Sequence, residues 1–145
     1  MPLPFTDLLR FIAARFDRSA STPAPRFSTP TARGAHGERV AASFLRTRGY
    51  RVLYRNYLTE RGEIDLVCRD GKVLVFVEVR SRESTDFGRP EETIGPAKQE
   101  SLRYAAGRYL ALLGRDDLHY RFDAVEVILA QGRVPECTLI QNLFS

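Results

Sequence analysis

An Asp-Gly pair at residues 70 and 71 separates two segments rich in aliphatic and β-branched residues, 62–69 and 72–80. This arrangement is a strong short-range signal for a β-hairpin, because glycine readily adopts the positive φ that a two-residue hairpin turn requires. We therefore expect two antiparallel strands joined at residues 70 and 71. Side chains alternate between the two faces of a strand, so the hairpin also predicts which residues share a face.

One face of the predicted hairpin is wholly apolar and is expected to be core. It carries Ile64, Leu66, Val73, Val75, Val77 and Val79. The opposite face combines acidic residues with large apolar ones, which is unusual for a sheet. Its members are Glu63, Asp65, Val67, Leu74, Phe76, Glu78 and Arg80.

The acidic residues of this second face lie close together. With the turn at residues 70 and 71, Glu63 lies opposite Glu78. Asp65 then lies opposite Phe76, on the diagonal from Glu78, so the carboxylates are about 5–7 Å apart and repel one another. A divalent cation such as Mg²⁺ or Mn²⁺, a shared proton, or arginine partners at a solvated rim would relieve this repulsion. A three-residue turn would instead separate Glu63 and Asp65 from Glu78.

The rest of the chain predicts a mixed α and β domain. Helices are expected over residues 34–48 and 96–113, further strands over 50–58, 121–130 and 134–139, and a loop over 81–94. The order is helix, three strands, helix and two strands. This order favours the α/β class in the broad sense, and within it an α+β arrangement. We expect one mixed sheet with a helix on at least one face.

Residues 1–33 differ in composition from the rest of the chain. They hold five arginines and two aspartates, which is +3 of the net charge of +4, so the remainder is close to neutral. Apolar residues recur at near-helical spacing up to Phe16, and residues 18–33 are rich in Ser, Thr, Pro and Ala. We therefore assign residues 1–33 to an amphipathic segment with a flexible linker, and residues 34–145 to a folded domain.

The same segment bears on the location of the protein. Asp7 and Arg10 interrupt any apolar core of a secretory signal, and the longest apolar runs fall far short of the roughly 20 residues of a membrane span. We expect a cytoplasmic protein that contacts no membrane, with an organellar transit peptide as the alternative interpretation of the arginine-rich start.

Two residues outside the hairpin are further candidates. Glu38 lies in the first turn of the first predicted helix, at the edge of its apolar stripe. Lys98, one of only two lysines in the chain, begins the row of the second helix that continues with Leu102. The helix dipole disfavours a lysine there unless it faces carboxylates or phosphate, so Lys98 either points at the acidic face or is a solvated surface residue. For Asp123, an ion pair with Arg121 or a neighbouring residue is favoured over a catalytic role.

Several motifs together resemble the YraN-type family of uncharacterised bacterial proteins. They are Arg61-Gly62-Glu63-Ile64-Asp65-Leu66-Val67, Val75-Phe76-Val77-Glu78-Val79-Arg80, Gly37-Glu38-Arg39-x-Ala41 with Gly49-Tyr50, Lys98-Gln99 and Arg121-Phe122-Asp123. They cover about residues 34–142, and their combination in this order is far more specific than any one of them. The family is similar to restriction-endonuclease-like nucleases of the PD-(D/E)XK group and, within it, to archaeal Holliday junction resolvases.

The resemblance implies a restriction-endonuclease-like core of order α-β-β-β-α-β-β and a metal-dependent endonuclease acting on DNA, with branched DNA as one substrate. Asp65 takes the place of the metal-binding aspartate and Glu78 that of the second acid. Glu38 matches a first-helix glutamate that completes the site, and Glu63 is a further ligand. The implied cofactor is Mg²⁺, or Mn²⁺, and the resolvases imply a homodimer.

Arg80 stands where the nuclease pattern has a lysine. Arginine stays protonated to a pKa above about 12, so it cannot act as a general base, although it can bind a phosphate. The catalytic candidates are Asp65, Glu78, Arg80 and Lys98, and the nucleic-acid-binding candidates are Arg80, Arg82, Lys98 and Gln99. Two alternatives stay open: a nucleic-acid-binding module of this fold without hydrolytic activity, and a protein adaptor that uses the N-terminal helix.

Overall fold

The computed structural model describes residues 30–83, 94–115, 117–130 and 132–145. Its elements are α2 (Pro30–Thr47), β1 (Arg51–Leu58), β2 (Glu63–Asp70), β3 (Val73–Arg82), α3 (Pro96–Leu113), β4 (Tyr120–Ile128) and β5 (Glu136–Ile140). The predicted amphipathic segment and most of the predicted loop at 81–94 lie outside the described residues. None of the helices described combines the length and the apolar character that a bilayer crossing requires.

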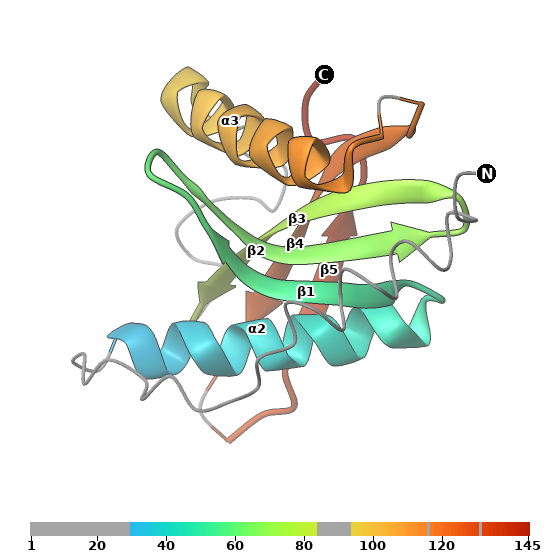
Figure 1. Cartoon of the computed structure of the whole chain (residues 1–145). Coiled ribbons are helices and arrows are strands. Elements are labelled where there is room, and N and C mark those ends of the chain that lie inside the picture. The colour runs from blue at the N-terminus through green and yellow to red at the C-terminus, as the bar shows by residue number, and fades with distance from the viewer. Residues whose placement is uncertain (1–29, 84–93, 116, 131) are drawn as a thin grey trace, which may run out of the picture.

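The five strands form one mixed sheet in the order β1-β2-β3-β4-β5. Neighbouring strands are antiparallel except β3 and β4, which run parallel and are connected through α3. α2 covers one face of this sheet and α3 covers the other (Figure 1). The predicted mixed sheet with a helix on at least one face is therefore confirmed.

Each helix buries its own apolar layer against the sheet. The α3 layer is formed by Ile64, Val67, Leu74, Phe76, Ile94, Leu102, Ala105, Ala106, Tyr109, Leu113 and Phe122. The α2 layer is formed by Ala41, Ala42, Leu45, Tyr50, Leu66, Cys68, Val75, Val77, Val125 and Val127. Both faces of the central strands are thus apolar, which explains the near-continuous run of hydrophobic residues in β3.

The prediction that Ile64 shares a face with Leu66 is wrong. Ile64 packs in the α3 layer, whereas Leu66 packs in the α2 layer. The pairing of β2 with β3 ends at Leu66 and Val77, so Ile64 has already left the β3 ladder. β2 is therefore no longer paired with β3 at the residues where its acidic side chains lie, although it stays paired with β1 there.

Two element boundaries differ from the prediction. α2 begins at Pro30, four residues before the expected start and within the predicted linker. Proline suits the first position of a helix, because its φ is fixed near the helical value and its missing N–H needs no partner there. β3 continues to Arg82, which pairs with Ile128 of β4. The polar end of β3 is therefore part of the sheet because it pairs with a strand that is distant in the sequence.

The hairpin turn lies one residue later than predicted. Asp70 pairs with Val73, so Gly71 and Lys72 form the turn, and Gly71 has a φ of 59°. A glycine at the first of two turn positions matches a type II′ turn, which suits the twist of a hairpin as well as the expected turn does.

This register changes which acids face each other. Val67 pairs with Phe76 and Leu66 with Val77, so Asp65 and Glu78 are the next opposed residues. The predicted pairing of Glu63 with Glu78 is wrong, as is that of Asp65 with Phe76. Within the paired ladder, Leu66–Asp70 and Val73–Val77, the new register preserves which residues share a face, because it shifts the pairing by an even number of positions.

Gly62, immediately before β2, packs against the backbone of α3. A Cβ atom at Gly62 would lie 2.6 Å from the carbonyl oxygen of Ser101. Because that backbone cannot rotate away, we expect Gly62→Ala to lower the free energy of unfolding by about 2 kcal/mol in urea denaturation. Gly107→Ala is the control, since nothing lies within 4 Å of that Cβ position on α3, and helix propensity favours alanine there. Equal stability of Gly62→Ala and the parent would contradict this close contact.

Candidate metal centre

Acidic residues from three elements converge where β2 separates from β3. Asp65 Oδ2 accepts a hydrogen bond of 2.8 Å from the backbone N–H of Val79, so a side chain of β2 binds the backbone of β3 beyond the paired ladder. α2 approaches β3 at the same end of the sheet, because a Cβ atom at Gly37 would overlap the Ser81 hydroxyl at 1.8 Å. This close approach of helix and strand brings Glu38 to the acidic residues.

Three carboxylates lie close enough to bind one cation. One oxygen each from Glu38, Glu63 and Asp65 lies within 4.8 Å of the others, and all three residues are half-buried. Carboxylate oxygens are the ligands that hard divalent cations such as Mg²⁺ and Mn²⁺ prefer. We call these three residues the carboxylate cluster.

The protein environment disfavours the charged form of two members of the cluster. Burial raises the pKa of Asp65 to about 8, and the nearby charge of Glu78 adds to this rise, while the Val79 N–H opposes it. Burial also raises the pKa of Glu38, against a hydrogen bond from the Asn56 side chain that lowers it. A bound cation would remove the cause of both rises, because it replaces lost hydration and screens the like charges.

Glu78 lies beside the cluster and pairs with Lys98. The Lys98 Nζ atom lies 3.3 Å from Glu78 Oε1, while Glu78 Oε2 is buried and has no hydrogen-bond partner among the residues that the structure describes. The side chain of Glu78 is 13% exposed and that of Lys98 is 48% exposed. Lys98, which lies on α3, therefore faces the acidic residues. Its ammonium group contacts the buried Glu78 carboxylate on one side and solvent on the other.

The other predicted site residues have contacts outside the carboxylate cluster. Arg82 Nε lies 3.2 Å from Glu126 Oε1, and Arg80 is half-buried next to Glu126 in the parallel register. The Gln99 side chain donates to the carbonyl oxygen of Ile94 at 2.9 Å, so its amide nitrogen is bound near the start of α3. Neither arginine is among the carboxylate cluster, but both lie on the strand that carries Glu78.

Two polar residues near the carboxylate cluster were not predicted from the sequence. Glu126 of β4 is almost fully buried, and its Oε2 has no hydrogen-bond partner within the described part of the chain. Asn56 of β1 has a φ of 52° and hydrogen-bonds Glu38. Asparagine is depleted in strands and enriched in the left-handed region, so its position within 50–58 was a signal that could have singled it out.

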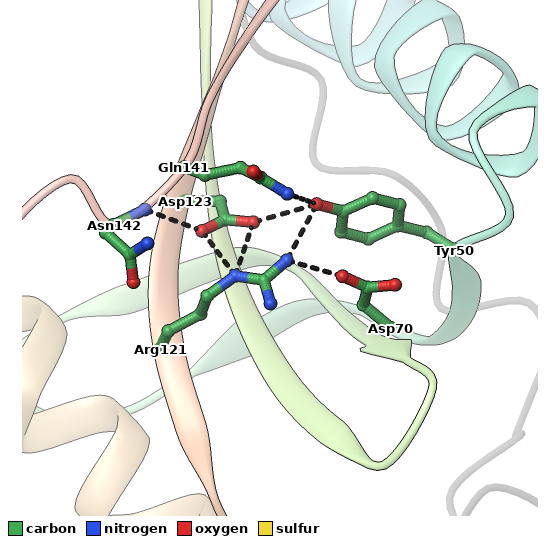
Figure 2. A network of polar contacts seen from close by, with 6 residues as sticks. All are labelled: Tyr50, Asp70, Arg121, Asp123, Gln141 and Asn142. Carbon is green, nitrogen blue, oxygen red and sulfur yellow. Dashed lines mark hydrogen bonds and ion pairs between the residues drawn. The ribbon is translucent and has the colours of Figure 1, made fainter.

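A second polar cluster lies at the other end of β2. Figure 2 shows its six residues, Tyr50, Asp70, Arg121, Asp123, Gln141 and Asn142. The fully buried Asp123 accepts hydrogen bonds from Arg121 Nε at 2.9 and 3.1 Å, from the Tyr50 hydroxyl at 3.1 Å and from the Asn142 N–H at 3.0 Å. The predicted ion pair of Asp123 with Arg121 is confirmed.

The remaining contacts of this polar cluster complete its hydrogen bonding. Arg121 Nη2 donates to Asp70 Oδ2 and to the Tyr50 hydroxyl, each at 2.8 Å, and Gln141 donates to the same hydroxyl at 2.9 Å. Although burial lowers the pKa of Arg121, hydrogen bonds to Asp123 and Asp70 hold it above its ordinary value. The polar groups of this cluster hydrogen-bond one another. The cluster therefore has a structural role and holds the C-terminal residues against the sheet.

Comparisons with known proteins place the chain among relatives of one description. The sequence profile described as "Uncharacterised protein family UPF0102" matches residues 37–127. The chain is 52% identical over 99 residues to a UPF0102 protein of Anaeromyxobacter dehalogenans, covering 68% of this chain and 74% of the relative. It is 47% identical over 111 residues to a UPF0102 protein of Symbiobacterium thermophilum, covering 77% and 94%. A UPF0102 protein of Geobacter sulfurreducens is 38% identical over 111 residues, covering 77% and 87%.

Proposed function

The chain belongs to the uncharacterised protein family UPF0102, and from this premise we propose that it is a metal-dependent endonuclease-like protein acting on DNA phosphodiesters. The observation that carries the proposal is the carboxylate cluster, in which Glu38, Glu63 and Asp65 offer oxygens within 4.8 Å of one another. A restriction-endonuclease-like core is part of the proposal. Its support is a mixed sheet whose acidic residues lie where two central strands separate.

The residues present fit a hard divalent cation. Glu38, Glu63 and Asp65 would hold it, with Glu78 as an additional ligand, and the buried Glu78 Oε2 lacks any other partner. When bound, Mg²⁺ or Mn²⁺ supplies an activated water and neutralises charge on a phosphate. These carboxylates would orient the cation beside Glu78, which Lys98 of α3 contacts at 3.3 Å.

Basic residues beside the cluster would bind the phosphate of the substrate. Lys98 is half-exposed and only 3.3 Å from Glu78, so it can contact a phosphate next to the cluster while it stays near a carboxylate. Arg80 and Arg82 follow Glu78 along β3, and Glu126 holds the Arg82 guanidinium at 3.2 Å. These cations would stabilise charge that develops on the phosphate, and none of the arginines acts as a base.

A second candidate function is DNA binding without hydrolysis. Arg80 favours it, because arginine occupies the position at which the nuclease pattern has a lysine and cannot accept a proton at neutral pH. The Lys98 ammonium group forms an ion pair with Glu78. A branched DNA substrate and a homodimer are further parts of the proposal, suggested by the sequence resemblance. A protein adaptor that uses the N-terminal helix is an alternative to it.

We expect the purified full-length protein with Mg²⁺ or Mn²⁺ to cleave at least one of branched, duplex and single-stranded DNA. Asp65→Ala should reduce the rate by about 100-fold or more, because it removes the central ligand of the cluster. Asp117→Ala is the matched control, since that carboxylate is exposed and pairs with Arg115 away from the cluster. Gel-based cleavage assays measure both.

Two outcomes would contradict the proposal in different ways. If the parent leaves all three DNAs uncut with either metal, hydrolysis is wrong, and salt-dependent but metal-independent DNA binding would then support the second candidate function. If the parent cleaves and Asp65→Ala cleaves equally well, the carboxylate cluster is the wrong site.

A further inference from the structure

Asn56 of β1 has an unusual backbone conformation next to the carboxylate cluster. Asn56 and Asn142, with φ values of 52° and 51°, are the two non-glycine residues with positive φ in the described part of the chain. This region is unfavourable for most side chains within a strand and is tolerated best by asparagine and aspartate. The conformation therefore needs a reason at this position.

The register places Asn56 across from the central acid of the cluster. Arg55 pairs with Leu66 and Tyr57 pairs with Ile64, so Asn56 is opposite Asp65 on the neighbouring strand. The Asn56 side chain also lies close enough to the Glu38 carboxylate to lower the pKa of Glu38 by hydrogen bonding. An ionised carboxylate only accepts hydrogen bonds, so the amide of Asn56 is the donor.

The left-handed residue also changes which way its neighbours point. Tyr54 and Tyr57 both pack against the α3 layer, with ring centroids 5.8 Å apart, although residues three apart in a regular strand face opposite ways. The break in alternation lies between them, at Asn56. It allows Tyr57 to join the α3 layer while the Asn56 amide contacts Glu38, which comes from the helix on the other face.

We propose that Asn56 is a positioning residue of the metal centre, whose side-chain amide holds the Glu38 carboxylate in the orientation that meets Glu63 and Asp65. This inference rests on the proposed function, because it concerns the same site. Glu38 is the one member of the cluster that comes from a helix rather than from β2. The hydrogen bond from Asn56 therefore ties the helical ligand to the sheet that carries the other two.

Metal affinity separates this role from a purely structural one. Replacing a residue that hydrogen-bonds a metal ligand typically weakens metal binding by 10–100-fold, so we expect about a 10-fold weaker affinity of full-length Asn56→Gly for Mn²⁺. Glycine adopts positive φ without strain, so this variant removes the amide and keeps the backbone. Its unfolding midpoint should stay close to that of the parent, and calorimetric titration with Mn²⁺ alone measures the affinity.

Asn142→Gly is the matched control. It is the same substitution at the same backbone conformation, in the C-terminal residues that bind Asp123 and not the carboxylate cluster. We expect its affinity for Mn²⁺ to equal that of the parent.

A double-mutant cycle with Glu38→Gln tests whether Asn56 acts through Glu38. In that background Asn56→Gly should change the Mn²⁺ affinity by less than about twofold, because the interacting carboxylate is already absent. A 10-fold loss in both backgrounds, or an unchanged affinity in Asn56→Gly alone, would overturn the role of Asn56 and leave the metal centre standing. A parent that binds no Mn²⁺ would overturn the metal centre and the role of Asn56 together.

Discussion

Asp65→Asn is expected to stabilise the metal-free protein, by about 5 kcal/mol at pH 8 and about 2 kcal/mol at pH 5. The half-buried Asp65 carboxylate loses hydration and faces the charge of Glu78, which together raise its pKa from 3.8 to about 8. Asparagine keeps the shape of the side chain and carries no charge. A residue that the proposed function requires is thus predicted to be a source of instability when no cation is bound.

The sign of the pH dependence follows from the same pKa. Between about pH 4 and pH 8 the folded parent holds a proton on Asp65 that the unfolded chain has released, so stability falls as the pH rises through this window. Asp65→Asn should lose this part of the slope. Urea denaturation in a chelator at pH 5 and pH 8 measures it for both proteins.

Two comparisons make this stability prediction specific. Asp117→Asn should leave the slope unchanged, because the Asp117 carboxylate is exposed and its pKa is lowered by the Arg115 hydrogen bond. Saturating Mg²⁺ should stabilise the parent and not Asp65→Asn, because only the parent retains the central ligand. A parent whose stability rises between pH 5 and pH 8 without metal would contradict the raised pKa.

Asp123→Ala is expected to have the opposite effect, a loss of about 4 kcal/mol in the free energy of unfolding. Asp123 is fully buried and accepts hydrogen bonds from Arg121, Tyr50 and the backbone of Asn142. Without its carboxylate the guanidinium of Arg121 stays in a half-buried position with only Asp70 as an ionic partner. Two further donors lose their acceptor, so several unsatisfied groups remain inside the protein.

Asp70→Ala is the informative control for the buried acid. It removes the other carboxylate that contacts Arg121, but the Asp70 side chain is 38% exposed, so solvent can replace it and the loss should be about 1 kcal/mol. Chemical denaturation monitored by far-UV circular dichroism compares the two variants. Equal losses in both would show that burial of Asp123 does not set the strength of this network.

The sequence predicted the faces of the hairpin better than its register. Alternation alone brought Asp65 and Glu78 to one face, because the strands are regular up to Leu66 and Val77. The position of the turn depended on distant contacts, since Asp70 stays in the strand and binds Arg121 of β4 at 2.8 Å. Local turn preferences carry no information about that partner.

The sequence predicted the charged residues of the candidate site but not the residues that contact them. Glu38 and Lys98 were chosen from their places in amphipathic helices, and both lie at the acidic residues. Asn56 and Glu126 were missed, because their roles arise from contacts with α2 and β3. Hydrophobic periodicity predicts which residues pack in the layers of the fold. It does not predict polar contacts between elements, because these depend on how the helices and strands are placed in three dimensions.

The irregular backbone of β1 also affects how the protein meets copies of itself. Among the described strands β1 pairs with β2 alone, so its outer backbone groups are available to another chain. A register shift between Val52 and Tyr54 and the left-handed Asn56 interrupt that edge twice within the strand Arg51–Leu58. A straight strand from a second molecule cannot form a continuous ladder along it, since bulges and kinks misalign successive hydrogen bonds. The distortion that brings Asn56 to Glu38 therefore also makes this edge a poor template for a strand of a second copy.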